Sequence, residues 1–346
     1  MSSEITRKTT LCCPSLHDLP LPPPGKTGWP WTEASLHLPE IRPHGFPWPR
    51  ISIVTPSYNQ GEFIEEAIRS VLLQGYPNLE YIIIDGESTD DTVEIIRKYE
   101  PWLTYWVSEK DDGQTFAIQK GMEMASGEIV NWLNSDDYLL PNSAQALAIA
   151  YHSASSSECV LCGDAIHITE NGKIISESRV VPAVDKVLPD APPLTGGIQA
   201  SWFLSKSAWQ KVGGINVDLN YTMDTDLYYR CNQQDVYFVS INQLIAVYRR
   251  HGETKTLRGW KESIAYKKRF YYGGLKTLDR STSKIYRPRI QRLLFACYLK
   301  SISFQDSFVD RLSKIVLALK ECPGVLFIPY QLYRLCRILL RGYVSS

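Results

Sequence analysis

Between residues 50 and 133, short apolar runs alternate with longer stretches whose apolar residues recur at helical spacing. The apolar runs cover residues 51–54, 81–84, 104–107 and 128–133. Between them, residues 63–72, about 91–98 and 114–125 have the apolar spacing of helices. Strands that alternate with helices form βαβ units, whose strands are parallel and lie in one sheet. The pattern therefore predicts an α/β fold with a Rossmann-like, mostly parallel central sheet and flanking helices.

The first 49 residues differ in composition from the rest of the chain. Nine prolines lie between residues 20 and 49, and such a segment favours extended backbone and cannot form a packed domain alone. Three tryptophans stand among them, Trp29, Trp31 and Trp48. Because exposed tryptophan is costly, we expect this proline-rich arm to lie across the surface of the domain that follows.

The second half of the chain is less regular. Residues 159–168 and 173–180 flank Asn171-Gly172, which favours a hairpin. Helices are predicted at 205–212 and 224–233, strands at 236–241 and 244–248, and helix from about Arg258 onward. We therefore divide the chain into an N-terminal arm (1–49), an α/β domain (50–255) and a helical C-terminal extension (256–346).

Composition limits the partners and the compartment. The 37 basic and 37 acidic side chains balance to zero, so no overall field favours nucleic acid. The eight cysteines do not suggest a disulfide framework in a chain of this length, and Cys159 and Cys162 are expected to be buried strand residues.

The N-terminus lacks the apolar core of a signal peptide, and no apolar run reaches the roughly 20 residues of a membrane span. We expect a cytoplasmic protein.

Polar clusters follow the predicted strands at the point where each strand ends. They are Ser57-Tyr58-Asn59, Asp85-Gly86 and Asn134 to Asp137. In open α/β sheets, ligands bind beyond the carboxyl ends of the strands. Asp136 and Asp137 offer the oxygen ligands that Mg²⁺ and Mn²⁺ prefer, although adjacent aspartates also serve as turn residues or helix caps. Asp85 could accept a hydrogen bond from a nucleobase, or could be a turn aspartate before glycine.

The same clusters resemble the inverting glycosyltransferases of family 2, which have the GT-A fold. The resemblance rests on three motifs in order, Ile53 to Gln60, Asp85 to Thr92 and Asn134 to Asp137, and it extends over residues 50–255. It implies transfer of a sugar from a nucleotide-diphosphate sugar, most simply a UDP-sugar, to a saccharide or lipid-linked acceptor. A divalent metal, Mn²⁺ or Mg²⁺, would assist departure of the diphosphate.

The resemblance also implies roles for individual residues. The nucleotide site would comprise Thr55, Pro56, Tyr58, Asn59, Asp85, Asp112 and Asn134. The metal would be held by Asp136, assisted by Asp137. Asn134 stands where the family's metal motif has an aspartate, which puts the strength of metal binding before the donor arrives in doubt.

An inverting reaction needs a general base that deprotonates the acceptor. The segment Tyr221 to Leu227 resembles the element that carries this base, and we assign the role to Asp224; an N-cap role for Asp224 is the alternative. Asp226, two residues on, would point elsewhere on a helix. Gln199 matches a stretch on the acceptor side. His251 matches a histidine that could reach the diphosphate or the metal, or could be a loop residue.

The C-terminal extension carries apolar residues interleaved with Arg334, Arg337 and Arg341. Basic amphipathic helices lie on anionic membrane surfaces, which would suit a lipid-linked acceptor and a peripheral position at the inner face of the membrane. Packing on the catalytic domain or on a second copy is the alternative.

Two other classes of protein share parts of this pattern. A sugar-nucleotide nucleotidyltransferase carries a glycine-rich loop after the first strand, and residues 55–60 have none. A non-catalytic nucleotide-sugar-binding subunit of a glycan-assembly complex would not need both an Asp136-type and an Asp224-type carboxylate.

Overall fold

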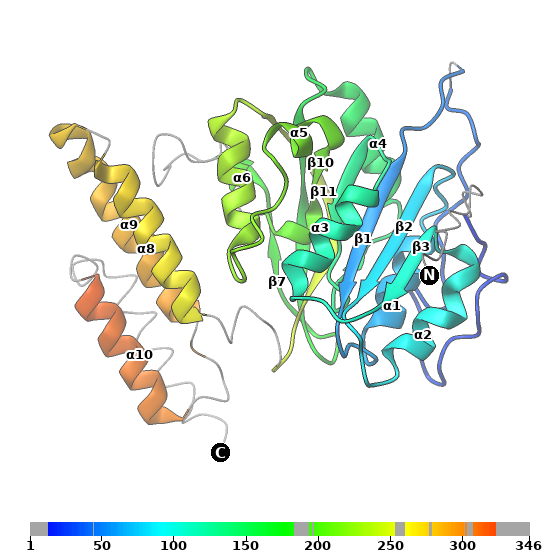
Figure 1. The fold of residues 1–346 in the computed structure, drawn as a ribbon, viewed down its shortest axis with the longest axis horizontal. Coiled ribbons are helices and arrows are strands. Elements are labelled where there is room, and N and C mark those ends of the chain that lie inside the picture. The colour runs from blue at the N-terminus through cyan, green and yellow to red at the C-terminus, as the bar shows by residue number, and fades with distance from the viewer. Residues whose placement is uncertain are drawn as a thin grey trace. The chain divides into compact units, whose positions relative to one another are not determined.

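The computed structural model describes residues 13–43, 45–182, 194–195, 197–252, 260–276, 279–300, 302 and 307–322. They belong to two compact units, one that runs to Arg250 and one that begins at His251. The first unit is built around a nine-stranded sheet with the order β3-β2-β1-β4-β10-β6-β11-β5, and β7 pairs with β6 (Figure 1).

One half of this sheet is wholly parallel. It contains β1 (Ile51–Ser57), β2 (Leu79–Asp85), β3 (Tyr105–Ser108) and β4 (Ile129–Trp132). Every residue of β1, β2 and β4 is buried, because helices cover both faces of the sheet. This explains why these strands appear in the sequence as continuous apolar runs rather than as alternating patterns.

The other half of the sheet is mixed. It contains β5 (Tyr138–Leu139), β6 (Cys159–Thr169), β7 (Ile174–Ser178), β10 (Trp202–Ser205) and β11 (Tyr237–Arg250). β10 runs antiparallel to both β4 and β6, and β6 and β11 are parallel. The predicted hairpin is confirmed as β6–β7. A separate two-stranded sheet joins β8 (Val181–Pro182) to β9 (Leu194–Thr195).

Helices form a layer on each face. On one face lie α1 (Ile64–Leu72), α2 (Thr92–Tyr99) and α4 (Ser143–Ser153). On the other lie α3 (Gln114–Met124), α5 (Lys206–Lys211) and α6 (Met223–Gln233) (Figure 1). Short 3₁₀ turns η1 (Glu100–Trp102) and η2 (Gln199–Ser201) complete the unit. α3 packs closely on the sheet, since a Cβ on Gly121 would lie 2.3 Å from a Val54 methyl carbon.

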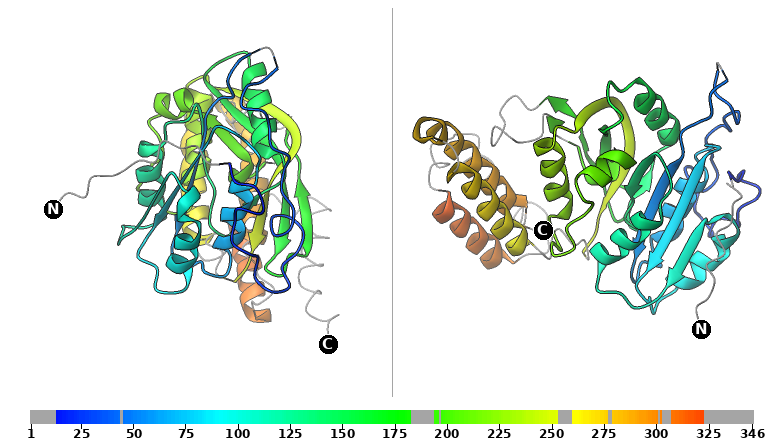
Figure 2. Two further views of the ribbon diagram at one scale, coloured as in Figure 1. Left: turned by 90° about the vertical axis from the view of Figure 1, so that its right-hand side faces the viewer. Right: turned by 45° about the horizontal axis from the view of Figure 1, so that its top comes forward.

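Two predictions about strands need correction. The strands expected at 236–241 and 244–248 are one element, β11, which bends where its pairing with β6 shifts register between Ser240 and Leu244 (Figure 2). A bulge of this kind lets a long strand curl without ending. β5 and β10 were not predicted, because two to four residues are too few to show a period.

The proline-rich arm packs on the first unit. Trp31 and Trp48 are buried, and Trp29 packs against the cluster beneath α1, α2 and α4 and donates from its indole N–H to the Leu139 carbonyl at 2.8 Å. The Arg69 guanidinium, inaccessible to solvent, donates to the carbonyls of Pro20, Pro30 and Trp31. These bonds satisfy a buried cation with main-chain dipoles.

The second unit contains α8 (Trp260–Lys276), α9 (Arg280–Lys300) and α10 (Phe308–Glu321). α9 packs against both of the others through a buried strip that includes Ile290, Leu294 and Phe295. Lys268 of α8 and Glu321 of α10 form an ion pair. The basic amphipathic segment around Arg334 to Arg341 lies outside the described residues.

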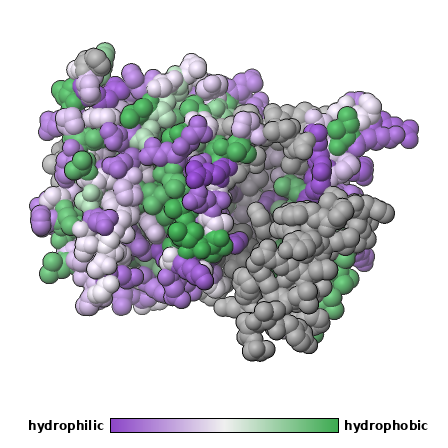
Figure 3. Space-filling model, turned by 180° about the vertical axis from the view of Figure 1, so that it is seen from behind, coloured by the Kyte–Doolittle hydropathy of each residue, from purple (hydrophilic) through white to green (hydrophobic). Residues whose placement is uncertain are grey.

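Two features of the whole chain follow from composition. Cys159 and Cys162 are buried in β6 as expected, and the described cysteines are free thiols. Figure 3 shows hydrophilic and hydrophobic residues mixed over much of the visible described surface. Among the described helices, none combines the length and apolar character that crossing a bilayer requires.

Candidate functional site

The parallel half of the sheet brings three of the predicted clusters to one edge. In the strand register Ser57 lies beside Asp85, and Asp85 beside Ser108. Val54 of β1 lies beside Trp132, the last residue of β4. The carboxyl ends of β1, β2 and β3 therefore coincide. β4 runs in the same direction and ends three residues short of the end of β1, so the segment after β4 continues toward the same edge. This edge, with the residues that follow each strand, is the candidate site.

The loops after β1 and β2 are fastened to each other. The Asn59 side-chain oxygen accepts from the Thr89 N–H at 2.8 Å, and the Asn59 N–H donates to the Ser88 hydroxyl at 2.8 Å. Asn59 itself has the left-handed backbone (φ 50°) that asparagine tolerates. Asn59 thus shapes the loop, while the neighbouring Tyr58 is 61% exposed and faces solvent at the site.

Thr55 and Pro56 lie inside β1 and are buried. The Thr55 hydroxyl is hydrogen-bonded to the Tyr81 hydroxyl at 3.0 Å, and burial raises the pKa of Tyr81. The Thr55 side chain therefore belongs to the core. The Ser57 hydroxyl, at the end of the same strand, is buried and finds no hydrogen-bond partner among the residues that the structure describes.

Asp85 is fully buried and its carboxylate is held from three directions. Its Oδ2 accepts from the Ser108 hydroxyl at 2.6 Å and from the Ser88 N–H at 2.9 Å, and its Oδ1 accepts from the Ser88 hydroxyl at 2.5 Å. Three hydrogen bonds of this kind fix the orientation of the carboxylate group. Asp85 is fixed in place at the edge, with much of its acceptor capacity already in use.

Asp111 lies closer to this edge than the sequence suggested. Its carboxylate accepts from the Gly113 N–H at 2.8 Å and stands 3.2 Å from the position that a Cβ on Gly86 would take. Asp112, which the sequence analysis selected, is exposed. The glycine at position 86 is the signal in the sequence, because a residue without a side chain there lets the Asp111 carboxylate approach the end of β2.

Hydrogen bonds connect Asn134 and Asp137, in the loop after β4, to each other and to other elements. The Asn134 Oδ1 accepts from the Gln114 side chain at 2.8 Å, and its Nδ2 donates to Asp137 Oδ2 at 3.3 Å. Asp137 Oδ1 accepts from the Arg249 N–H at 3.0 Å. Burial first, and the charge of Asp136 second, raise the pKa of Asp137 well above its usual range. Both Asp137 oxygens are thus used to hold the loop.

Asp136 differs from its neighbour because it is only half-buried. Its main-chain carbonyl accepts from the Arg249 side chain at 3.1 Å. Within the described part of the chain, no three His, Cys, Asp or Glu side chains gather to hold a metal ion. The donor set nevertheless suits a hard cation held by one carboxylate together with oxygens from a diphosphate and water, as Mg²⁺ commonly is.

Asp224 and Asp226 lie in the first turn of α6, whose N-cap is Thr222. The N-cap alternative for Asp224 is therefore wrong. Asp226 pairs with Arg230 at 2.7 Å, whereas among the described residues Asp224 has no ion-pair partner; its Oδ1 accepts from the Thr225 N–H at 2.6 Å.

Contacts of α6 connect Asp224 to the same edge. One helical turn from Asp224, the Tyr228 ring meets the Trp202 ring edge-to-face at 4.9 Å between centroids. Trp202 begins β10, which runs antiparallel beside β4 with Leu204 opposite Val130, so Trp202 is near the carboxyl end of β4. Burial, and next the charge of Asp224, raise the pKa of Tyr228.

Gln199 and His251 have different surroundings. The Gln199 side-chain amide donates to the Trp132 carbonyl at 2.6 Å and to the Asn131 side chain at 3.0 Å, which places Gln199 at the end of β4. His251 is buried and is the first described residue of the second unit. Residues 183–193 and 196, which precede Gln199 in the sequence, lie outside the described residues.

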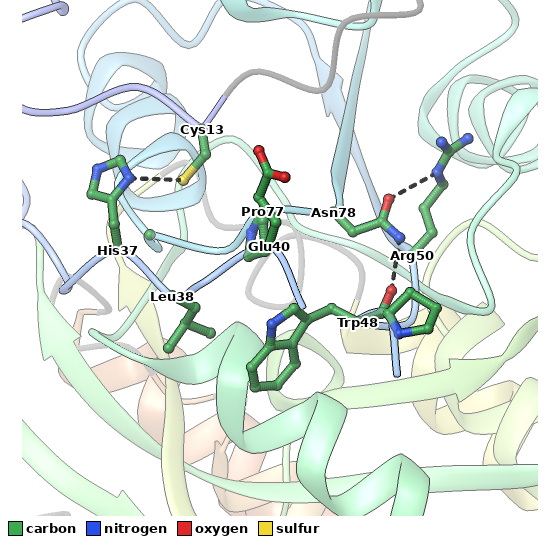
Figure 4. A pocket seen from close by; sticks show the side chains of 10 residues that line it. Cys13, His37, Leu38, Glu40, Trp48, Arg50, Pro77 and Asn78 are labelled. Atoms are coloured by element: carbon green, nitrogen blue, oxygen red, sulfur yellow. Dashed lines mark hydrogen bonds between the residues drawn. The ribbon is translucent and has the colours of Figure 1, made fainter. Parts of the chain in front are cut away.

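A cavity of about 600 Å³ opens elsewhere in the first unit (Figure 4). Arg50 and Asn78, which line it, directly precede β1 and β2. The cavity therefore lies at the amino ends of the strands, against the arm, and the candidate site lies at their carboxyl ends.

Comparison with known proteins agrees with this geometry. Residues 52–210 match the family model described as Glycosyl transferase family 2. An uncharacterized glycosyltransferase of Mycobacterium tuberculosis is 30% identical over 188 residues, which is 53% of this chain and 68% of the relative. The chain belongs to glycosyltransferase family 2. This confirms the family that the three motifs indicated.

Other relatives of this family 2 chain are longer proteins. Chondroitin synthase of Escherichia coli is 26% identical over 215 residues, which is 61% of this chain and 30% of the synthase. The chain spans about a third of the length of the first curated relatives that it matches.

Solved structures confirm the GT-A fold. S. aureus TarS 1–349 in complex with UDP-GlcNAc aligns with a TM-score of 0.53 and 16% identity, covering 78% of this chain and 79% of that one. The mannosyltransferase PcManGT from Pyrobaculum calidifontis, in complex with GDP-Man and Mn²⁺, aligns with a TM-score of 0.51 and 16% identity over 85% of both chains.

Proposed function

We propose that this family 2 chain transfers a sugar from a nucleotide-diphosphate sugar to a saccharide or lipid-linked acceptor in one inverting displacement. The observation that carries the proposal is the shared edge at which the segments after β1, β2, β3 and β4 meet. A nucleotide site and a candidate base on α6 border this edge. The acceptor hydroxyl oxygen forms a bond to the anomeric carbon as the bond to the diphosphate breaks.

The nucleoside would bind at the ends of β1 and β2. Asp85 and Asp111 flank the space beside Gly86, where either carboxylate can accept a base or ribose donor. Tyr58 offers an exposed ring, and the main chain of Thr55 and Pro56 offers peptide groups. UDP is our first choice of nucleotide. GDP is the second, since structural neighbours bind one or the other.

The diphosphate would lie near the loop after β4. We assign the metal to Asp136, and we assign Asp137 and Asn134 to holding that loop, because the bonds to Arg249 and Gln114 already engage them. A divalent cation there would act as a Lewis acid on the departing diphosphate. The metal or diphosphate role that the resemblance gives to His251 stays a prediction from the sequence.

Asp224 is our candidate for the general base. It carries no ion pair among the described residues, and it stands in the first turn of α6, one helical turn from Tyr228. The proton of the acceptor hydroxyl would pass to Asp224 while the electron pair of the broken bond stays on the diphosphate. Gln199 would contact the acceptor through its side-chain oxygen.

The acceptor belongs to polysaccharide biosynthesis in this proposal, as the relative named chondroitin synthase suggests. The proposal includes three expectations that rest on the sequence alone. They are that the protein is cytoplasmic, that it binds the membrane surface peripherally and that it forms a homo-oligomer.

Calorimetric titration tests nucleotide binding and the metal together. We expect the wild-type chain to bind UDP or GDP more tightly with Mn²⁺ than in EDTA. Asp136→Ala should remove this difference because the metal would lose its protein ligand. Asp235→Asn, at an exposed position before β11 with a backbone φ of 55° that asparagine tolerates, is the matched control and should keep it. Equal binding in Mn²⁺ and in EDTA by the wild type would show that the assigned metal role is wrong.

A further inference from the structure

Arg249 near the end of β11 joins segments that are far apart in sequence. Its Nε donates to the Asp136 carbonyl at 3.1 Å, and one guanidinium nitrogen, Nη1, donates to the Glu170 carbonyl in the β6–β7 turn at 3.1 Å. The other, Nη2, pairs with Glu66 in the first turn of α1 at 2.5 Å. The Arg249 main-chain N–H holds Asp137.

The guanidinium of Arg249 is also enclosed by rings. Its central carbon lies 5.1 Å from the centroid of Phe63 and 5.6 Å from that of Tyr138. The side chain is 5% exposed and Glu66 is 16% exposed. Removing both charges from water is costly, and apolar residues often replace buried ion pairs without loss of stability. The buried Arg249–Glu66 pair is therefore better explained by the conformation that it gives the loop after β4 than by a gain in folding stability.

We infer that Arg249 is a positioning residue for the donor site, and this inference rests on the proposed function. By donating to the Asp136 carbonyl and, through its main-chain N–H, to the Asp137 carboxylate, Arg249 would hold the loop in a conformation in which the Asp136 carboxylate can serve as the metal ligand. Glu66 fixes Arg249 in turn, so the loop after β4 is tied to the start of α1. Arg249 touches neither substrate nor metal in this role.

Arg249→Lys tests the inference, because lysine keeps the charge near Glu66 but loses the planar fork that reaches two carbonyls. The readout is the Mn²⁺ concentration that half-saturates the enhancement of UDP or GDP binding, measured by calorimetry. We expect this concentration to rise about tenfold or more, and nucleotide binding in EDTA to stay within about twofold of wild type, since the residues of the nucleoside pocket are untouched.

Arg69→Lys is the matched control. Arg69 is also buried and also donates to main-chain carbonyls, but those carbonyls belong to the arm. This variant should melt at a lower temperature and keep the wild-type Mn²⁺ requirement. If both variants change that requirement equally, the effect of Arg249 is structural and the inference is overturned.

Glu66→Gln decides the matter if Arg249→Lys does not fold. It keeps a side-chain acceptor for Arg249 and removes one charge, and we expect a smaller rise in the Mn²⁺ requirement. A folded Arg249→Lys or Glu66→Gln variant with wild-type Mn²⁺ dependence overturns the inference while nucleotide binding by the wild type still stands. A wild-type chain that binds no nucleotide overturns the proposed function and the inference with it.

Discussion

At the scale of single residues, the two aspartates in the first turn of α6 have different surroundings. Asp226 forms an ion pair with Arg230, whereas among the described residues Asp224 accepts hydrogen bonds from Thr225 and has no ion-pair partner. The Arg230 guanidinium thus occupies the Asp226 carboxylate. The resemblance and the helical spacing both favoured Asp224, and this difference in partners is consistent with that choice, which stays a prediction.

Asp224→Asn should leave donor binding close to wild type and lower the turnover number by about 10²–10⁴-fold, because the amide cannot accept the proton. Asp226→Asn is the matched control and should lower the melting temperature slightly while it keeps most of the turnover. Both are measured by release of the nucleotide diphosphate and by calorimetric donor binding. Near-normal turnover in Asp224→Asn would remove this residue from the mechanism.

The position of Asn134 is explained by its neighbours. Its amide nitrogen donates to buried Asp137 at 3.3 Å, and an aspartate there would bring two carboxylates together. Burial and Asp136 already disfavour the charged form of Asp137 and raise its pKa. Asparagine in place of the family's aspartate at position 134 thus fits a loop that is held by hydrogen bonds of side-chain amides.

Asn134→Asp should therefore destabilise the metal-free chain by about 1–3 kcal/mol, since Asp137 loses its donor and faces a like charge. Urea unfolding in EDTA measures this free energy. Asn134→Ala, which loses the bonds without adding charge, should cost less. Equal or greater stability of Asn134→Asp in EDTA would contradict this account of the loop.

At the scale of elements, the arm is a structural part of the first unit. It has little regular structure of its own, yet Arg69 of α1 bonds to three of its carbonyls and stacks over Trp31 at 5.5 Å. Proline-rich backbone has few internal hydrogen bonds, so its carbonyls are available to a buried cation.

Trp31→Ala should lower the free energy of unfolding by about 3–5 kcal/mol, because a buried ring that also covers Arg69 is lost. Leu36→Ala, in the same arm but at an 85% exposed side chain, should change it by no more than about 0.5 kcal/mol. Urea unfolding of the full chain compares the two. If the Trp31 and Leu36 variants unfold alike, the arm does not contribute to the fold as described.

At the scale of the whole molecule, strand pairing in the sheet of the first unit is parallel in one half and mixed in the other. The parallel half brings the nucleotide clusters together, and the mixed half, with its bent β11, carries Arg249 back to the loop after β4. The candidate site therefore draws on residues from Thr55 to Arg249, although its motifs occupy only short stretches of sequence.

Local patterns in the sequence were enough to predict the α/β fold and the edge of the sheet at which the clusters meet. Continuous apolar runs and helical spacing are properties of consecutive residues, and parallel pairing aligns the carboxyl ends of the strands. The family was indicated by the resemblance of three motifs, each of which lies at or just after the end of a strand.

Only the tertiary structure decided which side chains in those motifs are available. Asp85, Asn134 and Asp137 are engaged by Ser108, Gln114 and Arg249, which come from other elements. The positions of Asp111 and Arg249 follow from Gly86 and from the bend of β11. Hydrogen bonds between distant segments depend on how strands and helices pack, and the spacing of residues along one segment does not contain that information.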